Sequence, residues 1–261
     1  MIPVLDLAGG QAVLARGGRR EAYAPVQSVL VAGQGAGDPL ALARAFRDVL
    51  GCDECYVADL DAITGGVVQH ALLGQLAALG CRLLVDAGVA DPRGARALAA
   101  AGAARVVVGL ETLPSFAALE AVVRALGAER VVFSLDLVRG APLSRSRALG
   151  GSTALTPLAF AGAAVEAGAG GILVLDLARV GGGRGVDPGL VAALRRAHPD
   201  AELLAGGGVA SRRELERLAD LGLDGVLVAT ALHTSGLTRD DLEAVRRRPL
   251  PGPRRHPSDS R

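Results

Sequence analysis

Two aspartates stand where apolar runs end, Asp6 after IPVL and Asp136 after VVFSL. The segments around them resemble each other, VLDLAGG at 4–10 and SLDLVRG at 134–140. Two opposed carboxylates suit general acid–base catalysis, in which one group abstracts a proton and the other delivers one, provided that their pKa values differ. A single aspartate at a strand end more often caps the next turn. Because these two are related by a repeat, we predict Asp6 and Asp136 as a catalytic acid–base pair.

A run of three glycines at 206–208 closes another apolar segment and precedes a helical pattern. Glycines at a strand end expose backbone N–H groups, and a helix start adds partial positive charge, so together they form an anion site, most often for phosphate. The alternative is a tight turn that needs glycine for a positive φ angle. The next apolar run ends in Ala229 and Thr230, whose hydroxyl can donate to an anion. We predict that Gly207 and Gly208 bind a substrate phosphate together with Ala229 and Thr230.

The segment 203–232 that carries these residues has an ungapped copy at 83–112, LLVDAGVADPRGARALAAAGAARVVVGLET. Self-similarity of this kind indicates a fold built from two fused halves. In the copy, Gly88 takes the place of a phosphate-turn glycine and Gly109 that of Ala229. We therefore predict Gly88 and Gly109 as further substrate-binding residues.

The two copies differ in charge where the strands end. Asp86 takes the position of Gly206, and Glu111 takes that of Ala231. A carboxylate near 4 Å from a phosphate charge costs roughly 1 kcal/mol per charge pair even in water. We expect this half to prefer a hydroxyl, an amine or a cation, and we expect phosphate or sulfate to occupy only the 203–232 side.

Asp59 and Asp176 form a second pair of repeat-related carboxylates, in VADLDAITGG at 57–66 and VLDLARVGGG at 174–183. Asp61 lies close to the first of them. Such groups can bind substrate hydroxyls or orient loops, and the residue types leave both roles open. Asp176 is included among the candidate substrate-binding residues.

A scaffold must bring these strand ends together, and the hydrophobic pattern predicts one. Apolar runs of about five residues alternate eight times with helical patterns of about ten, which indicates βαβ units and a parallel sheet. Eight units in about 250 residues predict an α/β fold, a single (β/α)8 TIM barrel whose active site lies at the carboxyl ends of its strands. The two-fold half-barrel repeat favours this closed barrel over a doubly wound open sheet. The expected strands are 2–6, 55–59, 82–86, 105–109, 131–136, 171–176, 202–206 and 225–229, and the expected helices are 39–50, 68–79, 92–101, 115–126, 156–167, 188–197, 212–221 and 239–247.

Composition excludes several classes of function. All 28 basic residues are arginine, so no lysine Schiff base can form, and a net charge of +1 gives no reason to expect a nucleic acid or a membrane as partner. The four histidines are scattered, and the three cysteines are expected to be buried or half-buried thiols. We expect no metal and no cofactor. Without a signal peptide or an apolar run of membrane-spanning length, we expect a cytoplasmic protein.

No linker divides the chain, so residues 1–248 are expected to form one domain. The tail 249–261, PLPGPRRHPSDSR, is rich in proline and polar residues and is expected to be disordered. The oligomeric state stays open, with a monomer as the expectation.

Taken together, the motifs resemble one known family. IPVLDLAGGQAV, YVADLDAITGG, VVFSLDLVRG and LLAGGGVASRRELERL resemble the HisA/HisF family of histidine-biosynthesis (β/α)8 barrels, over about residues 1–246. The resemblance implies that Asp6 and Asp136 match the family's catalytic aspartates on strands 1 and 5. It also implies a substrate with a phosphate at each end and chemistry without metal or organic cofactor. ADLDA at 58–62 and the absence of lysine favour the isomerase branch, which performs an Amadori rearrangement, an aldose–ketose isomerisation.

The chain departs from the family pattern at several places, and these keep a second hypothesis open. The family's first phosphate turn, Gly-Gly-Gly-Ile-Arg, is DAGVA at 86–90. Leu175 replaces a threonine or serine, VGG at 180–182 replaces Asp-Gly-Thr, and the usual tryptophan is missing. The second hypothesis is a divergent relative outside histidine biosynthesis that converts a singly phosphorylated substrate or binds it without turnover.

Overall fold

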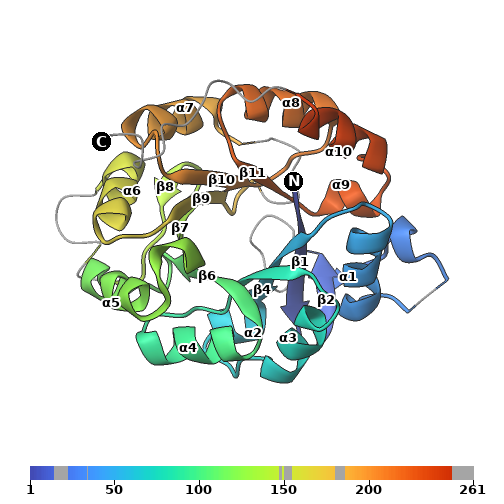
Figure 1. Cartoon of the computed structure of the whole chain (residues 1–261), viewed down its shortest axis with the longest axis horizontal. Helices are drawn as coiled ribbons and strands as arrows, with labels where there is room; N and C mark the ends of the chain where they lie inside the picture. Colours follow the sequence, from blue (N-terminus) through green and yellow to red (C-terminus); the bar gives the residue numbers. More distant parts are fainter. Residues whose placement is uncertain (15–22, 34, 147–148, 150–154, 180–185, 249–261) are drawn as a thin grey trace, which may run out of the picture.

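Eight parallel strands close into a barrel in the computed structural model (Figure 1), which describes all residues except 15–22, 34, 147–148, 150–154, 180–185 and 249–261. The strands pair in chain order, and the last pairs with the first because Ile2 aligns with Leu227. The predicted (β/α)8 barrel is therefore confirmed, and the open sheet is excluded. The barrel strands are β1 (Ile2–Ala8), β4 (Glu54–Asp59), β5 (Arg82–Asp86), β6 (Ala103–Gly109), β7 (Val131–Val138), β9 (Gly171–Asp176), β10 (Glu202–Gly206) and β11 (Gly225–Val228).

Helices surround the barrel (Figure 1), and the eight predicted ones are present with ends within about two residues of the expected positions. They are α1 (Pro39–Asp48), α3 (His70–Ala77), α4 (Pro92–Ala100), α5 (Phe116–Leu126), α6 (Pro157–Glu166), α7 (Pro188–Ala197), α8 (Arg212–Asp220) and α10 (Arg239–Arg246). Four short elements were not predicted, because segments of three or four residues are too short to show a hydrophobic period. They are α2 (Leu60–Ile63), α9 (Thr230–His233) and the 3-10 helices η2 (Val29–Val31) and η3 (Ala128–Arg130).

Local sequence explains where three of the main helices begin. Asp38, Asp91 and Asp187 each precede a proline at the first helical position, and each carboxylate accepts hydrogen bonds from N–H groups of the first turn. These N–H groups have no partner within the helix, and the fixed φ of proline suits the first turn. Aspartate before proline therefore sets the start of α1, α4 and α7.

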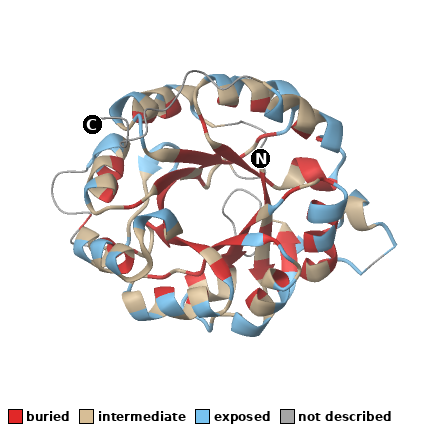
Figure 2. Cartoon of the chain, viewed as in Figure 1, coloured by how far each residue is buried: buried red, intermediate tan, exposed pale blue. Residues whose placement is uncertain are grey.

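Two apolar layers hold the barrel. One lies between the strands and the surrounding helices, so that each helix buries its inner side and exposes its outer side (Figure 2). The other fills the barrel itself, with fully buried Leu84, Val107, Val132, Leu173 and Leu204 pointing inward. Because the interior is packed, a ligand can enter only at an end of the barrel.

The sheet register places the predicted site residues in the same arrangement in both halves. Asp6 on β1 and Asp86 on β5 align with the same residue of the strand between them, Ala58. Asp136 on β7 and Gly206 on β10 likewise share a partner on the strand between them. The half-barrel repeat thus pairs each catalytic candidate with one position that is aspartate in the first half and glycine in the second.

Each catalytic candidate is followed by a hairpin that the sequence analysis did not predict. β2 (Gln11–Leu14) folds back on β1 and pairs with β3 (Ala24–Pro25), while β8 (Ala141–Pro142) folds back on β7. A carboxylate from the end of the next barrel strand, or from the short helix that follows it, holds each turn. Asp61 accepts a hydrogen bond from Gly9 N at 2.8 Å, and Asp176 accepts from Arg139 N and Gly140 N, both at 3.0 Å.

The amino-terminal end of the barrel carries a partly buried ion cluster. The guanidinium of Arg105 on β6 pairs with Glu202 on β10, and its Nη1 lies 3.6 Å from Oε1 of Glu54 on β4. This end lies opposite the predicted active site. In barrels of this kind, polar residues at the amino-terminal end serve stability rather than chemistry. The cluster ties β4, β6 and β10 together across the barrel.

Two sequence predictions fall on residues outside the described part of the chain, the disordered tail at 249–261 and the segment 180–182. Among the described residues, no helix is both long enough and apolar enough to cross a membrane. The three cysteines are free and buried, as expected.

Candidate active site

A cavity of about 680 Å³ opens at the carboxyl ends of the strands, the end at which the sequence analysis placed the active site. All eight barrel strands contribute to its wall, and its size suits a small-molecule substrate. It contains most of the predicted site residues. Those that line it are Asp6, Asp136, Gly109, Gly207, Gly208, Ala229 and Thr230.

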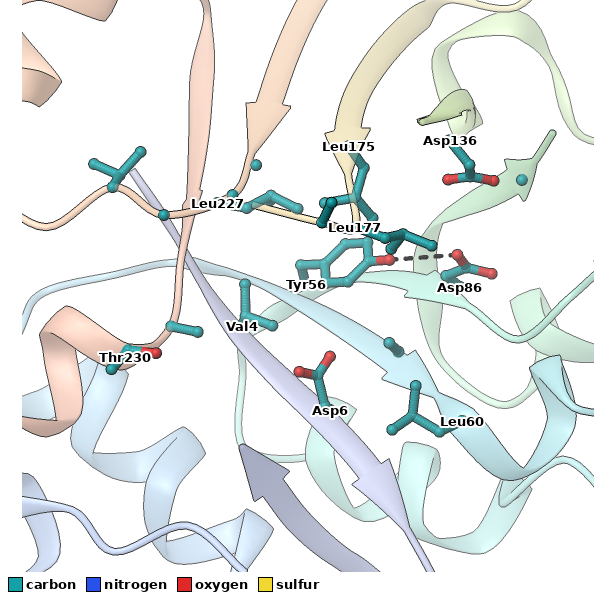
Figure 3. A pocket seen from close by; sticks show the side chains of 18 of the residues that line it. Val4, Asp6, Tyr56, Leu60, Asp86, Asp136, Leu175, Leu177, Leu227 and Thr230 are labelled. Atoms are coloured by element: carbon teal, nitrogen blue, oxygen red, sulfur yellow. Dashed lines mark hydrogen bonds between the residues drawn. The ribbon is translucent and has the colours of Figure 1, made fainter. Parts of the chain in front are cut away.

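Asp6 points into this cavity from β1 (Figure 3). Burial raises the pKa of its carboxyl from 3.8 to about 7, with a smaller contribution from the charge of Asp86. Because Asp6 lines the cavity, a ligand bound there can exchange a proton with its carboxyl group. A carboxyl group with a pKa near neutrality can donate or accept a proton at physiological pH.

Asp136 enters the cavity from β7 and is held more firmly than Asp6. Ser134 Oγ donates to its Oδ1 at 2.6 Å, and Glu111 N donates to its Oδ2 at 3.0 Å. Burial and, next, the charge of Asp86 raise its pKa from 3.8 to about 7, although both hydrogen bonds act in the opposite direction. The sequence analysis gave Ser134 no role; in the structure its hydroxyl orients the carboxylate of Asp136.

Asp86 is a third carboxylate in the same cavity. Tyr56 Oη donates to its Oδ2 at 3.3 Å (Figure 3), and Gly88 N donates to its Oδ1 at 3.1 Å. A Cβ atom on Gly109 would lie 2.9 Å from Oδ2 of Asp136 and 3.9 Å from Oδ2 of Asp86. Gly109 therefore leaves room for two neighbouring carboxylates. Sequence reasoning missed Tyr56, since a tyrosine inside a strand reads as core.

The glycine turn after β10 forms the other side of the cavity. Gly207 and Gly208 have φ angles of +121° and +68°, so glycine is required there for the backbone as well as for access. Gly206 also packs closely, because a Cβ on it would lie 3.1 Å from Leu175 Cδ1. Thr230 begins α9 on the same side, away from Asp86 and Asp136 (Figure 3). This wall carries no carboxylate among its described lining residues.

Two predicted binding residues lie outside the cavity wall. Asp176 holds the β7–β8 turn through its hydrogen bonds and lies 3.3 Å from Nε of Arg179. Gly88 lies behind Asp86, where a Cβ would come within 3.1 Å of Ile63 Cα. Asp59, for which both roles were open, is fully buried and accepts hydrogen bonds from Ala62 N and Gln69 N. The structure thus gives Asp59 and Asp176 loop-orienting contacts.

The wall formed by β9 is apolar. Leu175 and Leu177 line the cavity there, where the resemblance predicts a hydroxyl at position 175. Leu143 and Val138 extend the same surface from the β7 hairpin. In the described part of the chain, no group of three or more histidine, cysteine or acidic side chains has the arrangement of a metal site. The cavity therefore joins four acidic side chains, an apolar wall and a glycine turn, the acidic residues being Asp6, Asp86, Glu111 and Asp136.

The comparisons with known proteins agree with this arrangement. Residues 1–238 match the family described as "Histidine biosynthesis protein". The chain belongs to this family. The resemblance noted in the sequence is thereby confirmed, and the two aspartates, the glycine turn and the half-barrel symmetry lie within the matched region.

Several relatives carry the name 1-(5-phosphoribosyl)-5-((5-phosphoribosylamino)methylideneamino) imidazole-4-carboxamide isomerase. The protein from Deinococcus radiodurans is 33% identical over 204 residues, covering 76% of this chain and 82% of that one. The protein from Thermus thermophilus is 30% identical over 234 residues, covering 89% and 94%. An uncharacterised protein of Methanocaldococcus jannaschii is 28% identical over 249 residues, covering 94% of this chain and 96% of that one.

The Ser134–Asp136 contact yields a first prediction. Replacing Ser134 with alanine removes a hydrogen bond that lowers the pKa of Asp136. The pKa should therefore rise further, and the corresponding limb of the pH–rate profile should move to higher pH. Ser115→Ala is the control, because Ser115 only caps α5. An unchanged Ser134→Ala profile would show that Asp136 does not titrate in the reaction.

Proposed function

We propose that this protein catalyses an aldose–ketose isomerisation of a phosphorylated ribosylamine, the Amadori reaction of the isomerase relatives in histidine biosynthesis. The observation that carries the proposal is the placement of Asp6 and Asp136 in one cavity, with the pKa of both raised to about 7. The family membership supports the same reaction. The glycine turn after β10, with Thr230, is the proposed site for a substrate phosphate.

The reaction needs one proton donor and one proton acceptor. The protonated carboxyl group of the pair delivers a proton to the ring oxygen of the ribosylamine, and the C1–O bond breaks to give an open-chain protonated imine that carries a hydroxyl. The ionised carboxylate then removes the proton from C2, leaving a neutral enol-amine. Addition of a proton to C1 and loss of the proton from the C2 hydroxyl give the aminoketose. The atoms balance without an oxidant, since C1 is reduced as C2 is oxidised within one molecule.

The direct test is an assay with the imidazole carboxamide aminoaldose as substrate, with product followed by chromatography. Turnover by the purified protein supports the proposal. Binding without product would contradict it and would favour a phosphosugar-binding barrel. The altered turn at 86–90 motivates that second candidate.

Four further parts of the proposal concern the cofactor, location, oligomeric state and partner of the enzyme. We propose that it needs no metal or organic cofactor, so that activity should persist after dialysis against a chelator. We also propose a cytoplasmic location. We further propose that the protein is a monomer, and light scattering after gel filtration measures its molar mass. Its partner is a phosphorylated small molecule.

A further inference from the structure

The two ends of the cavity differ at one pair of equivalent positions. Asp86 and Gly206 correspond in the sequence repeat, and one intervening strand separates each of them from a catalytic candidate in the same register. At Gly206 the wall is backbone, and the cavity reaches the glycine turn. At Asp86 a carboxylate occupies the equivalent space (Figure 3).

The contacts of Asp86 remove the means of binding an anion at its end. The N–H of Gly88, the counterpart of Gly208, donates to Asp86 Oδ1 at 3.1 Å. Backbone N–H groups of this kind are what a glycine turn offers to phosphate. The hydroxyl of Tyr56, which could also serve an anion, donates to Asp86 Oδ2. Asp86 thus occupies two donors and places its own charge in front of them.

A second carboxylate lies next to Asp86. Asp136 lies beside it across Gly109, where a Cβ atom would be 2.9 Å from Oδ2 of Asp136 and 3.9 Å from Oδ2 of Asp86. Glu111 also lines the cavity at this end, but its carboxylate forms an ion pair with Arg145. A phosphate placed here would meet the charge of Asp86, and that of Asp136 when it is ionised, in a partly desolvated site, and this repulsion would oppose its binding.

We propose that the cavity binds a substrate with phosphate at its β10–β11 end only, and that Asp86 at the β5–β6 end selects a hydrogen-bond donor, a hydroxyl or a protonated amine. Carboxylate oxygens accept from such groups, and Leu175 and Leu177 cover the apolar body between the two ends. This inference rests on the proposed function for the class of reaction, and it adds which end of the substrate carries the phosphate. It makes Asp86 a specificity-determining residue.

Calorimetry with three related ligands tests the proposal on the full-length protein. They are the imidazole carboxamide ribotide with both phosphates and its two analogues that each lack one phosphate. Compared with the doubly phosphorylated ribotide, one analogue should bind the wild-type protein at least about tenfold more weakly. The other analogue should bind as tightly as the doubly phosphorylated ribotide or more tightly. A loss of at least tenfold for both analogues would show two phosphate sites and would overturn the proposal.

Variants of Asp86 separate its charge from its size. Asp86→Gly restores the glycine found at position 206 and should bind the doubly phosphorylated ligand at least about tenfold more tightly than the wild type, a factor expected for removing one close charge. Asp86→Asn retains an oxygen that can accept from Tyr56 and should give an intermediate gain. No gain in either variant would overturn the role of Asp86.

Matched variants on the other side provide the control. Gly206→Asp introduces the equivalent carboxylate at the β10–β11 end. It should abolish the contribution that the phosphate bound at this end makes to ligand affinity. Since a Cβ at Gly206 lies close to Leu175 and Leu227, thermal melting checks its folding, and Thr230→Asp places a charge on the same side without that crowding. Persistence of phosphate binding in a folded Gly206→Asp or Thr230→Asp variant would overturn the assignment of the phosphate end.

These binding measurements do not depend on turnover. The expected pattern without any product would leave the inference in place and remove the isomerase proposal. Efficient turnover of the doubly phosphorylated substrate, with both phosphates needed for affinity, would confirm the isomerase and remove the inference. Crystals soaked in sulfate give an independent reading, with occupancy expected beside Gly207 and Gly208 and not beside Asp86.

Discussion

Replacing either Asp6 or Asp136 with asparagine is expected to lower kcat by about 10³-fold, within the 10²–10⁴ range typical of a lost general acid or base. Asparagine keeps the shape of the side chain but neither donates nor accepts a proton in the reaction. The two variants should not be additive, because both groups act in the same proton-transfer sequence. Steady-state kinetics of the two single variants and the double variant measure this. Near-wild-type kcat in either single variant would exclude that residue as acid or base.

The pH dependence of the same reaction follows from the two raised pKa values. Below both values the pair is fully protonated and lacks a base, and above both it is fully ionised and lacks an acid. Activity should therefore follow a bell-shaped profile with its maximum near pH 7. Each single asparagine variant should lose one limb of the bell in its residual activity. The limb that disappears assigns the acid or the base.

Stability provides the control for these variants. The pKa of Asp6 is raised from 3.8 to about 7 in the folded chain, so the folded state binds more protons than the unfolded state between these pH values. Stability is therefore greatest below about pH 4 with respect to this group and is lost as pH rises through 7. Asp6→Asn should melt at a higher temperature than the wild type at pH 8. A lower melting temperature would show that unfolding contributes to its loss of activity.

The largest effect on stability is expected from Arg105→Ala. Removing the guanidinium leaves the carboxylates of Glu54 and Glu202 close together at the amino-terminal end of the barrel, without their shared cation. Breaking a buried ion pair at one partner costs about 3–5 kcal/mol, and partial exposure here places the cost near 3 kcal/mol. A chain of this size should then melt roughly 6–12 °C lower. Thermal unfolding followed by circular dichroism measures the difference.

An exposed ion pair serves as the comparison for Arg105. Arg124 pairs with Glu120 one turn away on α5, and both side chains are largely exposed. Solvent screens such pairs, so Arg124→Ala should change the melting temperature little. Similar shifts for the two arginine variants would mean that the barrel cluster contributes no more than a surface pair. Activity measured well below the melting temperature should be retained in both.

Much of the fold was predictable because its signals are local. Five-residue apolar runs alternate with helical patterns, and aspartate before proline marks three helix starts, so strands and helices lie where the sequence placed them. The internal repeat identified Asp6 and Asp136 as an equivalent pair. It also identified the substitution of Gly206 by Asp86 in the other half. These features depend on residues near in sequence or related by symmetry.

The remaining features depend on contacts between segments that are far apart in the chain. Tyr56 and Asp86 lie 30 positions apart, and the parallel pairing of β4 with β5 brings the hydroxyl to the carboxylate. Asp176 was predicted to bind substrate, yet its hydrogen bonds from Arg139 N and Gly140 N hold it at the β7–β8 turn, and it does not line the cavity. The raised pKa values of Asp6 and Asp136 arise mainly from burial, and a strand-end motif does not predict how deeply a side chain is buried. Sequence thus determined which residue types stand at the strand ends, and tertiary structure decided which of them face the ligand, because side-chain direction and desolvation are set by neighbours distant in sequence.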